Sequence, residues 1–157
     1  MNPCPCGYAG DRQTHCQCNP DQVKKYRHRI SGPLLDRIDM HVPVTRISPA
    51  LLLGQNKAPE SSGTVRERVC QGRHRQLFRQ GGTNAQLPQS ELASACGLDS
   101  EKNRIIEAAI KALNLSPRAV HRSLRVARTI ADLAGEPTVT DTHLTEAFAY
   151  RNPELGL

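Results

Sequence analysis

Apolar residues recur at helical spacing through most of the second half of the chain. Asp99 is a suitable N-cap, and the apolar residues after it predict a helix over about 100–114. Ser116 can cap the next helix, which has Pro117 at its first position and a stop signal at Gly135. The apolar residues of this second helix share one face: Val120, Leu124, Ala127, Ala131 and Ala134.

Two further segments extend the helical pattern on either side. Val139 and Leu144 are spaced to form a hydrophobic staple around a helix from about Thr140 to about Tyr150. A shorter segment, 89–96, is bounded by a proline and a glycine and is also predicted to be helical.

The most basic predicted helix lies upstream of these. Thr64 and Glu67 form a T-x-x-E capping box for it, and Gly81 should end it. The stretch 48–63 is rich in turn-forming residues and is predicted to be a linker. We therefore expect a small bundle of four or five helices over 64–157.

The first 47 residues follow a different pattern. Apolar residues alternate with polar ones at Ile38, Met40, Val42 and Val44, which is the period of a β-strand. Pro43 lacks the N–H that a ladder requires, so the segment is predicted to be an edge strand. Because one edge strand cannot form a sheet, either this segment pairs with another chain or the sequence is the tail of a longer protein.

Charge and composition add limits to this picture. The 157 residues carry a formal charge of +6. Residues 1–50 hold seven basic and four acidic residues (+3), residues 51–86 six and two (+4), and residues 87–157 eight and nine (−1). Attraction for a polyanion should therefore lie in the first half.

Only two Phe and three Tyr are present, which argues against a sheet that stacks nucleic-acid bases. No apolar run could span a bilayer, so we expect a soluble, cytoplasmic protein.

Four cysteines form a C-x-C-x9-C-x-C pattern near the start: Cys4, Cys6, Cys16 and Cys18. Four thiolates can close a tetrahedral site around Zn²⁺, and metal binding can fold a loop that has almost no apolar residues to bury. The sequence favours one structural zinc, with His15 able to replace one cysteine. Two disulfides or four free thiols are the alternatives. Cys70 and Cys96 lie in helical patterns and are expected to be small buried apolar residues.

The helix capped by Ser116 carries three arginines in a stripe of about 60° opposite its apolar face: Arg118, Arg122 and Arg125. A solvated helix face is the simple explanation. However, Arg118 lies in the first turn, where the helix dipole disfavours a cation unless an anion is bound there. Arg118 is therefore a candidate phosphate contact.

Arg37 is a second candidate functional residue. It lies between Asp36 and Asp39 just before the predicted strand, so a local salt bridge is the competing interpretation. A third possibility is that the basic residues of 24–29, or those of the helix over 64–81, follow a nucleic-acid backbone.

Three segments together match a known family: MNPCPCG, RISGPLLDRIDMHVPV and SPRAVHRSLRVARTIADLAG. In them the chain resembles the C-terminal part of the magnesium-chelatase-like AAA+ ATPases of the ComM/YifB group, over essentially its whole length. It is similar, more remotely, to the chelatase ATPase subunit and to minichromosome-maintenance helicases. The resemblance implies a mainly α fold, in which a helical lid domain over 64–157 follows a remnant of an α/β AAA+ core over 1–47.

The resemblance also implies roles for individual residues. Asn2 resembles sensor 1, which helps to orient the attacking water. Arg37 resembles the arginine finger, which stabilises transition-state charge in the neighbouring subunit. Arg118 resembles sensor 2, a lid residue that contacts phosphate in its own subunit, and Arg122 is a further nucleotide-binding candidate. The implied cofactor is ATP with Mg²⁺. The implied partners are the protein's own N-terminal AAA+ core, further copies in a homo-hexamer, and DNA.

The chain departs from the family pattern in two respects. Chelatase subunits lack the cysteine-bearing loop, which the ComM-like group has, so chelatase chemistry implies no role for it. The chain also contains neither the phosphate-binding motif G-x-x-x-x-G-K-[ST] nor an apolar strand ending in Asp-Glu. We therefore expect a fragment of a longer ATPase that does not hydrolyse ATP alone.

Three functions are consistent with these observations. The first is part of a hexameric DNA motor, a helicase for branch migration in natural transformation and recombination, which the family's association with competence implies. The second is a zinc-containing module that binds nucleic acid or a protein without any nucleotide; steeply salt-dependent DNA binding would favour it. The third is a magnesium chelatase ATPase subunit, which ranks last because nothing in the sequence addresses a porphyrin.

Overall fold

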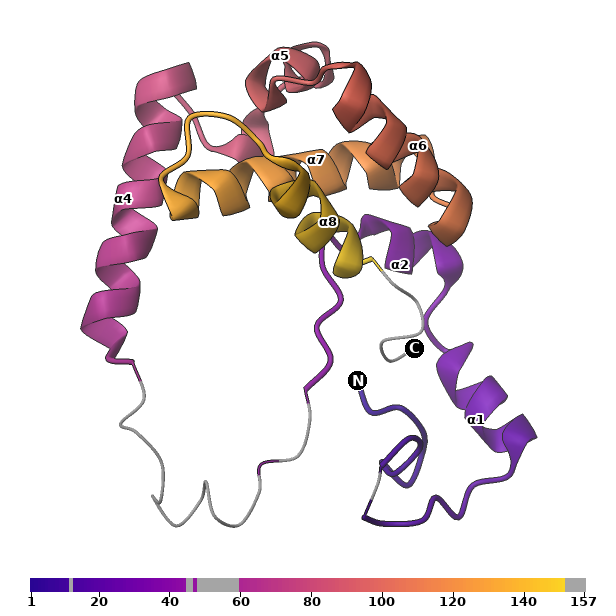
Figure 1. Ribbon diagram of the computed structural model, residues 1–157. Coiled ribbons are helices and arrows are strands. Elements are labelled where there is room, and N and C mark those ends of the chain that lie inside the picture. The colour runs from indigo at the N-terminus through magenta and orange to yellow at the C-terminus, as the bar shows by residue number, and fades with distance from the viewer. Residues whose placement is uncertain (12, 45–46, 48–59, 152–157) are drawn as a thin grey trace.

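The computed structural model describes residues 1–11, 13–44, 47 and 60–151, and this part of the chain is built from helices (Figure 1). The first two helices precede the gap in the description: α1 (Pro20–Arg27) and α2 (Gly32–Arg37). The others follow it: α4 (Ser62–Gln80), the 3-10 turns η1 (Asn84–Gln86) and η2 (Gln89–Glu91), α5 (Leu92–Cys96), α6 (Ser100–Leu113), α7 (Pro117–Ala134) and α8 (Asp141–Ala149). The expected mainly α fold is confirmed.

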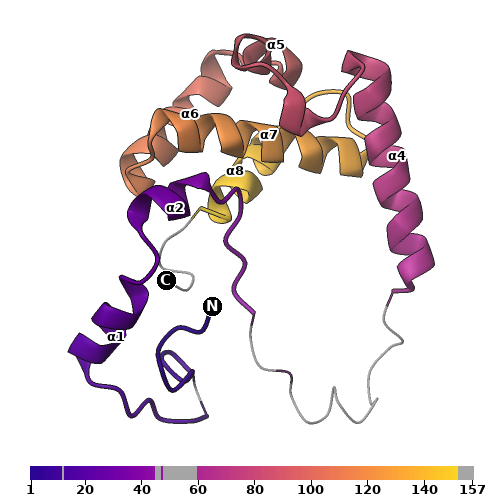
Figure 2. The same cartoon turned by 180° about the vertical axis from the view of Figure 1, so that it is seen from behind.

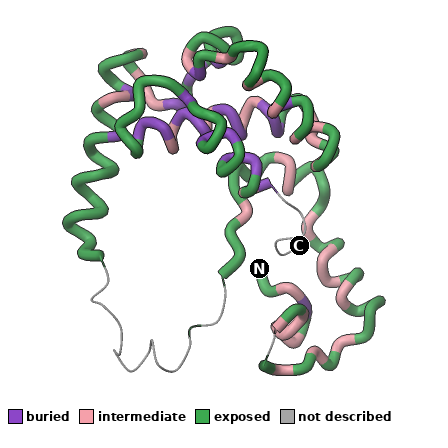
Figure 3. The backbone as a smooth tube through the Cα atoms, in the orientation of Figure 1, coloured by how far each residue is buried: buried purple, intermediate pink, exposed green. Residues whose placement is uncertain are grey.

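Helix α7 lies at the centre of a bundle formed by α4 to α8 (Figures 1 and 2). It packs against α4, α5 and α8, and more of its residues are buried than in any other described helix. The buried residues concentrate along α7 and α8, whereas α1 and the N-terminal half of α4 are largely exposed (Figure 3). The core beside α7 comes from several elements: Leu87, Leu92, Cys96, Ile106, Val139, Leu144 and Phe148.

The predicted caps of the second half are confirmed. The side chain of Asp99 accepts hydrogen bonds from the first turn of α6, and Ser116 Oγ accepts one from the Ala119 N–H of α7. Gly135 ends α7 with a φ of 85°, a left-handed conformation that an L side chain adopts at a cost. The side-chain caps of α6 and α7 are thus local contacts, formed within three residues of the capping residue.

The start of α4 corrects the sequence prediction. The true N-cap is Ser61, whose side chain accepts a hydrogen bond from the Thr64 N–H, so the helix begins one turn before the expected capping box. Of the predicted linker over 48–63, residues 48–59 lie outside the described residues, and its last two residues already belong to α4. Cys70 is exposed rather than buried, because it lies in 62–71, the half of α4 in which every residue is exposed, whereas Cys96 is buried as expected.

The described part of the first 47 residues forms two short helices that the sequence analysis did not predict. Asn19 caps α1 in a capping box with Gln22, and Pro20 occupies the first helical position. The signal N-P-D-Q was therefore present in the sequence. The edge strand predicted over 38–44 is not formed in the described residues, because no neighbouring strand is present to pair with it. Instead, the His41 N–H donates to the carbonyl of Tyr150 at 2.8 Å.

A buried polar network joins α4, η1 and α7 around one carboxylate. Asp132 is 1% exposed and accepts hydrogen bonds from Arg79 at 2.6 and 3.0 Å, from Arg128 at 2.9 Å and from the amide of Asn84 at 2.8 Å. Its backbone carbonyl accepts a further bond from Arg75 at 2.7 Å. Burial by itself would raise the pKa of Asp132, but the hydrogen bonds from Arg79 and Asn84 and the charge of Arg128 hold that pKa below its usual range.

Helices α4 and α7 approach one another closely beside this network. Gly72 is buried on α4, and a Cβ added there would lie 3.0 Å from Cδ2 of Leu133. The missing side chain thus lets the two helices come near enough for Arg75 and Arg79 to reach Asp132.

Replacing Asp132 by Asn should destabilise the bundle by about 3–5 kcal/mol, because the fully buried Arg128 would lose its charged partner. Urea unfolding monitored by circular dichroism measures this change. The matched control is Glu107→Gln on the exposed face of α6, which should shift the free energy of unfolding by no more than about 0.5 kcal/mol. Equal effects of the two substitutions would show that the network does not hold the bundle together.

The network should also make stability depend on acid. Because the pKa of Asp132 is lowered by folding, its contribution is fully present above the unfolded pKa of about 3.9 and is lost as the pH falls through the folded value. The difference in unfolding free energy between the native protein and Asp132→Asn should therefore shrink below about pH 4. A difference that stays constant from neutral to strongly acid pH would contradict this assignment.

Candidate functional site

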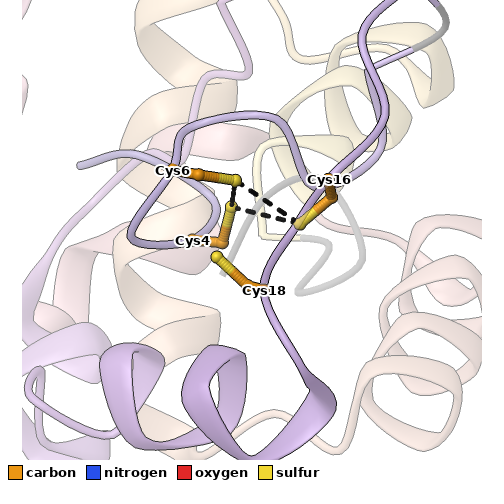
Figure 4. Close-up of side chains that lie close together, drawn as sticks. All are labelled: Cys4, Cys6, Cys16 and Cys18. Atoms are coloured by element: carbon orange, nitrogen blue, oxygen red, sulfur yellow. Dashed lines mark hydrogen bonds between the residues drawn. The ribbon is translucent and has the colours of Figure 1, made fainter.

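The four cysteines near the N-terminus converge on one point (Figure 4). Their sulfur atoms all lie within 4.8 Å of one another, and three of the separations are 3.3, 3.6 and 3.7 Å. A disulfide requires about 2.05 Å, whereas a tetrahedral metal with four thiolates separates its sulfurs by about 3.8 Å. The arrangement therefore fits a metal centre, and no disulfide joins these cysteines, so a metal site and four free thiols are the alternatives left.

The backbone around the cysteine cluster explains how a C-x-C spacing can serve such a site. The chain turns directly after Cys6, where Gly7 has a φ of 86° and its N–H donates to the carbonyl of Cys4. The Ala9 N–H then donates to the sulfur of Cys4 at 3.3 Å. The turn thus folds back over its own thiols, and Cys4 becomes fully buried although few apolar residues surround it.

The thiols of this cluster differ in acidity. Backbone N–H groups of Tyr8 and Gln17 donate to the sulfur of Cys6 and lower its pKa to about 6. At Cys18 the backbone N–H of Cys6 acts in the same direction, but burial and the neighbouring thiols outweigh it and raise the pKa to about 12. Four sulfurs this close cannot all ionise without a cation, and a bound divalent metal would supply that charge. His15 is exposed and does not belong to the cluster.

The cysteine cluster also organises its surroundings. Helix α1 begins two residues after Cys18, and Arg27 at the end of α1 donates from Nε to the carbonyl of Pro3 at 3.2 Å. Asn2 lies next to this contact and is exposed. In both views the N-terminus lies away from α2 and α7 (Figures 1 and 2), so the described chain does not bring Asn2 together with the candidate arginines.

Arg37 is the last residue of α2, and its side chain is exposed. Its Nη1 donates to the carbonyl of Pro33 at 2.8 Å, and within the described residues it forms no ion pair. The competing interpretation of a local salt bridge with Asp36 or Asp39 is therefore wrong. The guanidinium of Arg37 retains most of its donors for another molecule.

The two acids that flank Arg37 instead contact α7. Asp36 accepts a hydrogen bond from Ser116 Oγ at 2.7 Å. Asp39 forms an ion pair with Arg122. These contacts place the end of α2 against the first two turns of α7, where the pictures show the two helices side by side (Figures 1 and 2).

The predicted arginine stripe of α7 separates into three environments. Arg118 is exposed at the first turn, while Arg122 contacts Asp39. Arg125 donates from both Nε and Nη2 to the carbonyl of Leu87, at 3.2 and 2.9 Å, and so has a structural contact. Of the three, Arg118 alone lies exposed.

A cavity of about 420 Å³ lies between the α1–α2 connection, α2 and the start of α7. Its lining includes Leu35, Asp36, Ser116, His41 and Arg151. Arg151 is 6% exposed, and its Nε and Nη2 have no hydrogen-bond partner in the described chain. Burial, followed by the charge of Arg151, lowers the pKa of His41, so this imidazole is neutral beside the guanidinium at neutral pH.

Sequence reasoning missed two buried arginines, of which Arg151 lines the cavity and Arg128 belongs to the Asp132 network. Arg128 pairs with Asp132 four residues later on the apolar face of α7, and such an i,i+4 pair of opposite charges on a buried face was a usable signal. Arg151 lies just after α8, and nothing in the sequence pattern distinguishes it from a surface arginine. Both become apparent from their burial alone.

None of the described helices is long and apolar enough to cross a lipid bilayer.

Comparison with known families gives two matches. Residues 59–151 match the family described as magnesium chelatase, subunit ChlI C-terminal, and residues 1–52 match magnesium chelatase, subunit ChlI.

Individual proteins resemble the chain over nearly all of its length. It is 41% identical over 152 residues to competence protein ComM of Haemophilus influenzae and 42% identical over 152 residues to the uncharacterized protein YifB of Escherichia coli. An uncharacterized protein of Mycobacterium tuberculosis is 33% identical over 154 residues. Each match covers 96% of this chain, which spans only 29–30% of the length of these relatives. The chain therefore belongs to the magnesium-chelatase-like family, within which it resembles ComM and YifB.

Proposed function

We propose that this chain forms the C-terminal part of a magnesium-chelatase-like AAA+ ATPase that acts as a hexameric DNA motor. In this proposal ATP and Mg²⁺ bind to the N-terminal AAA+ core of the longer protein, and the helices α4 to α8 form the lid. The family membership and the likeness to a protein named for competence support this function, with branch migration during natural transformation as the process. DNA as the substrate is further supported by the positive charge of residues 1–86.

Arg37 carries this proposal. It ends α2 with an exposed guanidinium, and the acids beside it contact α7 rather than Arg37 itself. An arginine finger needs this combination, because its positive charge must be presented to the phosphates of a neighbouring subunit without an internal counter-ion. We assign Arg37 as the finger, Asn2 as sensor 1 and Arg118 as sensor 2. The exposure of Arg118 in the first turn of α7 supports its role as a phosphate contact, because the positive end of the helix dipole there favours an anion.

We also propose that the cysteine cluster holds one structural zinc ion through Cys4, Cys6, Cys16 and Cys18. Four protein ligands leave no position for a reacting water, so the ion would hold the turn of residues 4–18 and the start of α1 in place. The distances between the four cysteine sulfurs support tetrahedral coordination of the ion by thiolates. A closed tetrahedral set of four thiolates is typical of structural zinc sites.

In the full-length protein, Arg37→Ala should lower kcat for ATP hydrolysis by about 10³-fold or more, because the transition-state charge loses its partner. The affinity for ADP, measured by calorimetry, should change little. The matched control is Arg104→Ala, an exposed arginine on α6, which should leave turnover near the native value. Native turnover in Arg37→Ala would remove the arginine finger from the proposal.

Protein purified without chelator should contain about one zinc ion per chain, measured by mass spectrometry of the metal. Cys16→Ser should lose this ion, whereas Cys70→Ser, which changes an exposed cysteine outside the cluster, should keep it. Zinc should also be released on acidification, since its ligands must remain thiolates. Retention of a full equivalent by Cys16→Ser, or much less than one ion in the native protein, would refute the zinc site.

A further inference from the structure

The segment that carries Arg37 is held from both sides. One anchor, the carboxylate of Asp36, immediately precedes Arg37 and contacts Ser116; the second, Asp39, follows two residues later and contacts Arg122. These contacts join positions about 80 residues apart in sequence, so they are tertiary contacts and not features of α2 itself. The backbone of Arg37 is thus fixed relative to α7.

We propose that Ser116 and Arg122 are positioning residues for Arg37, so that the arginine finger moves as one unit with the helix that bears Arg118. This inference rests on the proposed role of Arg37. It assigns Arg122 to a contact within the protein and not to the nucleotide.

The hydrogen bonds of Ser116 show how the first anchor is built. Its Oγ accepts from the Ala119 N–H at 3.1 Å and donates to Asp36 at 2.7 Å. A hydroxyl has a single proton to donate, and Ser116 donates it to the carboxylate of Asp36, which directly precedes Arg37. A rotation of the first turn of α7 would therefore be transmitted directly to the end of α2.

The second anchor gives Arg122 a carboxylate partner within its own chain, so its charge is already compensated. Its side chain is 25% exposed and Nη1 is engaged with Asp39, whereas Arg118, one turn earlier, is exposed. A third contact, from the His41 N–H to the carbonyl of Tyr150, continues the attachment to the end of α8. Residues 36–41 are therefore attached to both helices that meet beside the cavity.

Loss of the anchoring contacts should affect the position of Arg37 more than the stability of the fold. An ion pair as exposed as that of Asp39 and Arg122 contributes little to folding, so its loss should leave the bundle intact. A catalytic group that is displaced by about 1 Å, in contrast, can cost roughly 10²-fold in rate. Disrupting the anchors should thus reduce turnover while the protein remains folded.

The test measures ATP hydrolysis and ADP binding in the full-length protein with Arg122→Gln, Asp39→Asn and Asp36→Ala. Asp36→Ala removes the first anchor but leaves the Ser116 cap of α7 in place. Each substitution should lower kcat by roughly tenfold or more and leave the Kd for ADP within about twofold. The charge exchange Asp39→Arg with Arg122→Asp should recover most of the lost kcat. Arg104→Gln on α6 is the matched control and should behave like the native protein.

A second measurement does not depend on ATP hydrolysis. Hydrogen–deuterium exchange of residues 36–41 should accelerate in Arg122→Gln and not in Arg104→Gln, because the His41 N–H is protected only while the segment stays attached. Weaker ADP binding by Arg122→Gln with an unchanged kcat would make Arg122 a nucleotide contact and overturn the inference. Native values of both kcat and exchange would overturn it as well.

Failure of the inference is distinguishable from failure of the proposed function. If Arg37→Ala hydrolyses ATP at the native rate, the assignment of the finger fails, and the positioning role fails with it. If Arg37→Ala is inactive but the anchor substitutions retain native turnover, the finger stands and the positioning role alone is refuted.

Discussion

The carboxylate of Asp132 is the constraint on which the bundle depends. It belongs to α7 and accepts hydrogen bonds from Arg79 of α4, from Arg128 of α7 and from the side-chain amide of Asn84. A buried charge of this kind is tolerated only when its partners are in place, so α4, η1 and α7 have to take up one relative arrangement. Gly72 permits the close approach that the network requires.

A rigid α7 has consequences at its other end. Its first two turns receive the segment of Arg37 through Asp36 and Asp39, and expose Arg118 beside that contact. The helix thus connects the buried network at its C-terminal end with the candidate nucleotide-facing arginines at its N-terminal end. The N-terminal segment that carries the cysteine cluster depends on different chemistry. It buries almost no apolar side chains, and its four cysteine sulfurs lie together at one point.

Local signals predicted the helices and their ends well where a capping residue was present, as at Asp99, Ser116 and Gly135. They misplace the start of α4, where both Ser61 and Thr64 suit an N-cap, and they do not predict α1, although Asn19 and Pro20 form a cap signal. The alternating segment 38–44 has the pattern of a strand, but a strand forms only when another strand supplies hydrogen bonds. Burial was predicted correctly for Cys96 and wrongly for Cys70, because only packing decides which half of α4 is covered.

The sequence by itself determined the helical periodicity, the caps, the four-cysteine pattern and the candidates Arg37 and Arg118, since each depends on residues close together in the chain. Only the tertiary structure decided how the charges pair. Asp36 and Asp39 could have neutralised Arg37, their neighbour in sequence, yet both contact α7 some 80 residues away. Long charged side chains reach many partners, and the choice among them depends on how the backbone elements pack and which groups lose water, which no local pattern specifies.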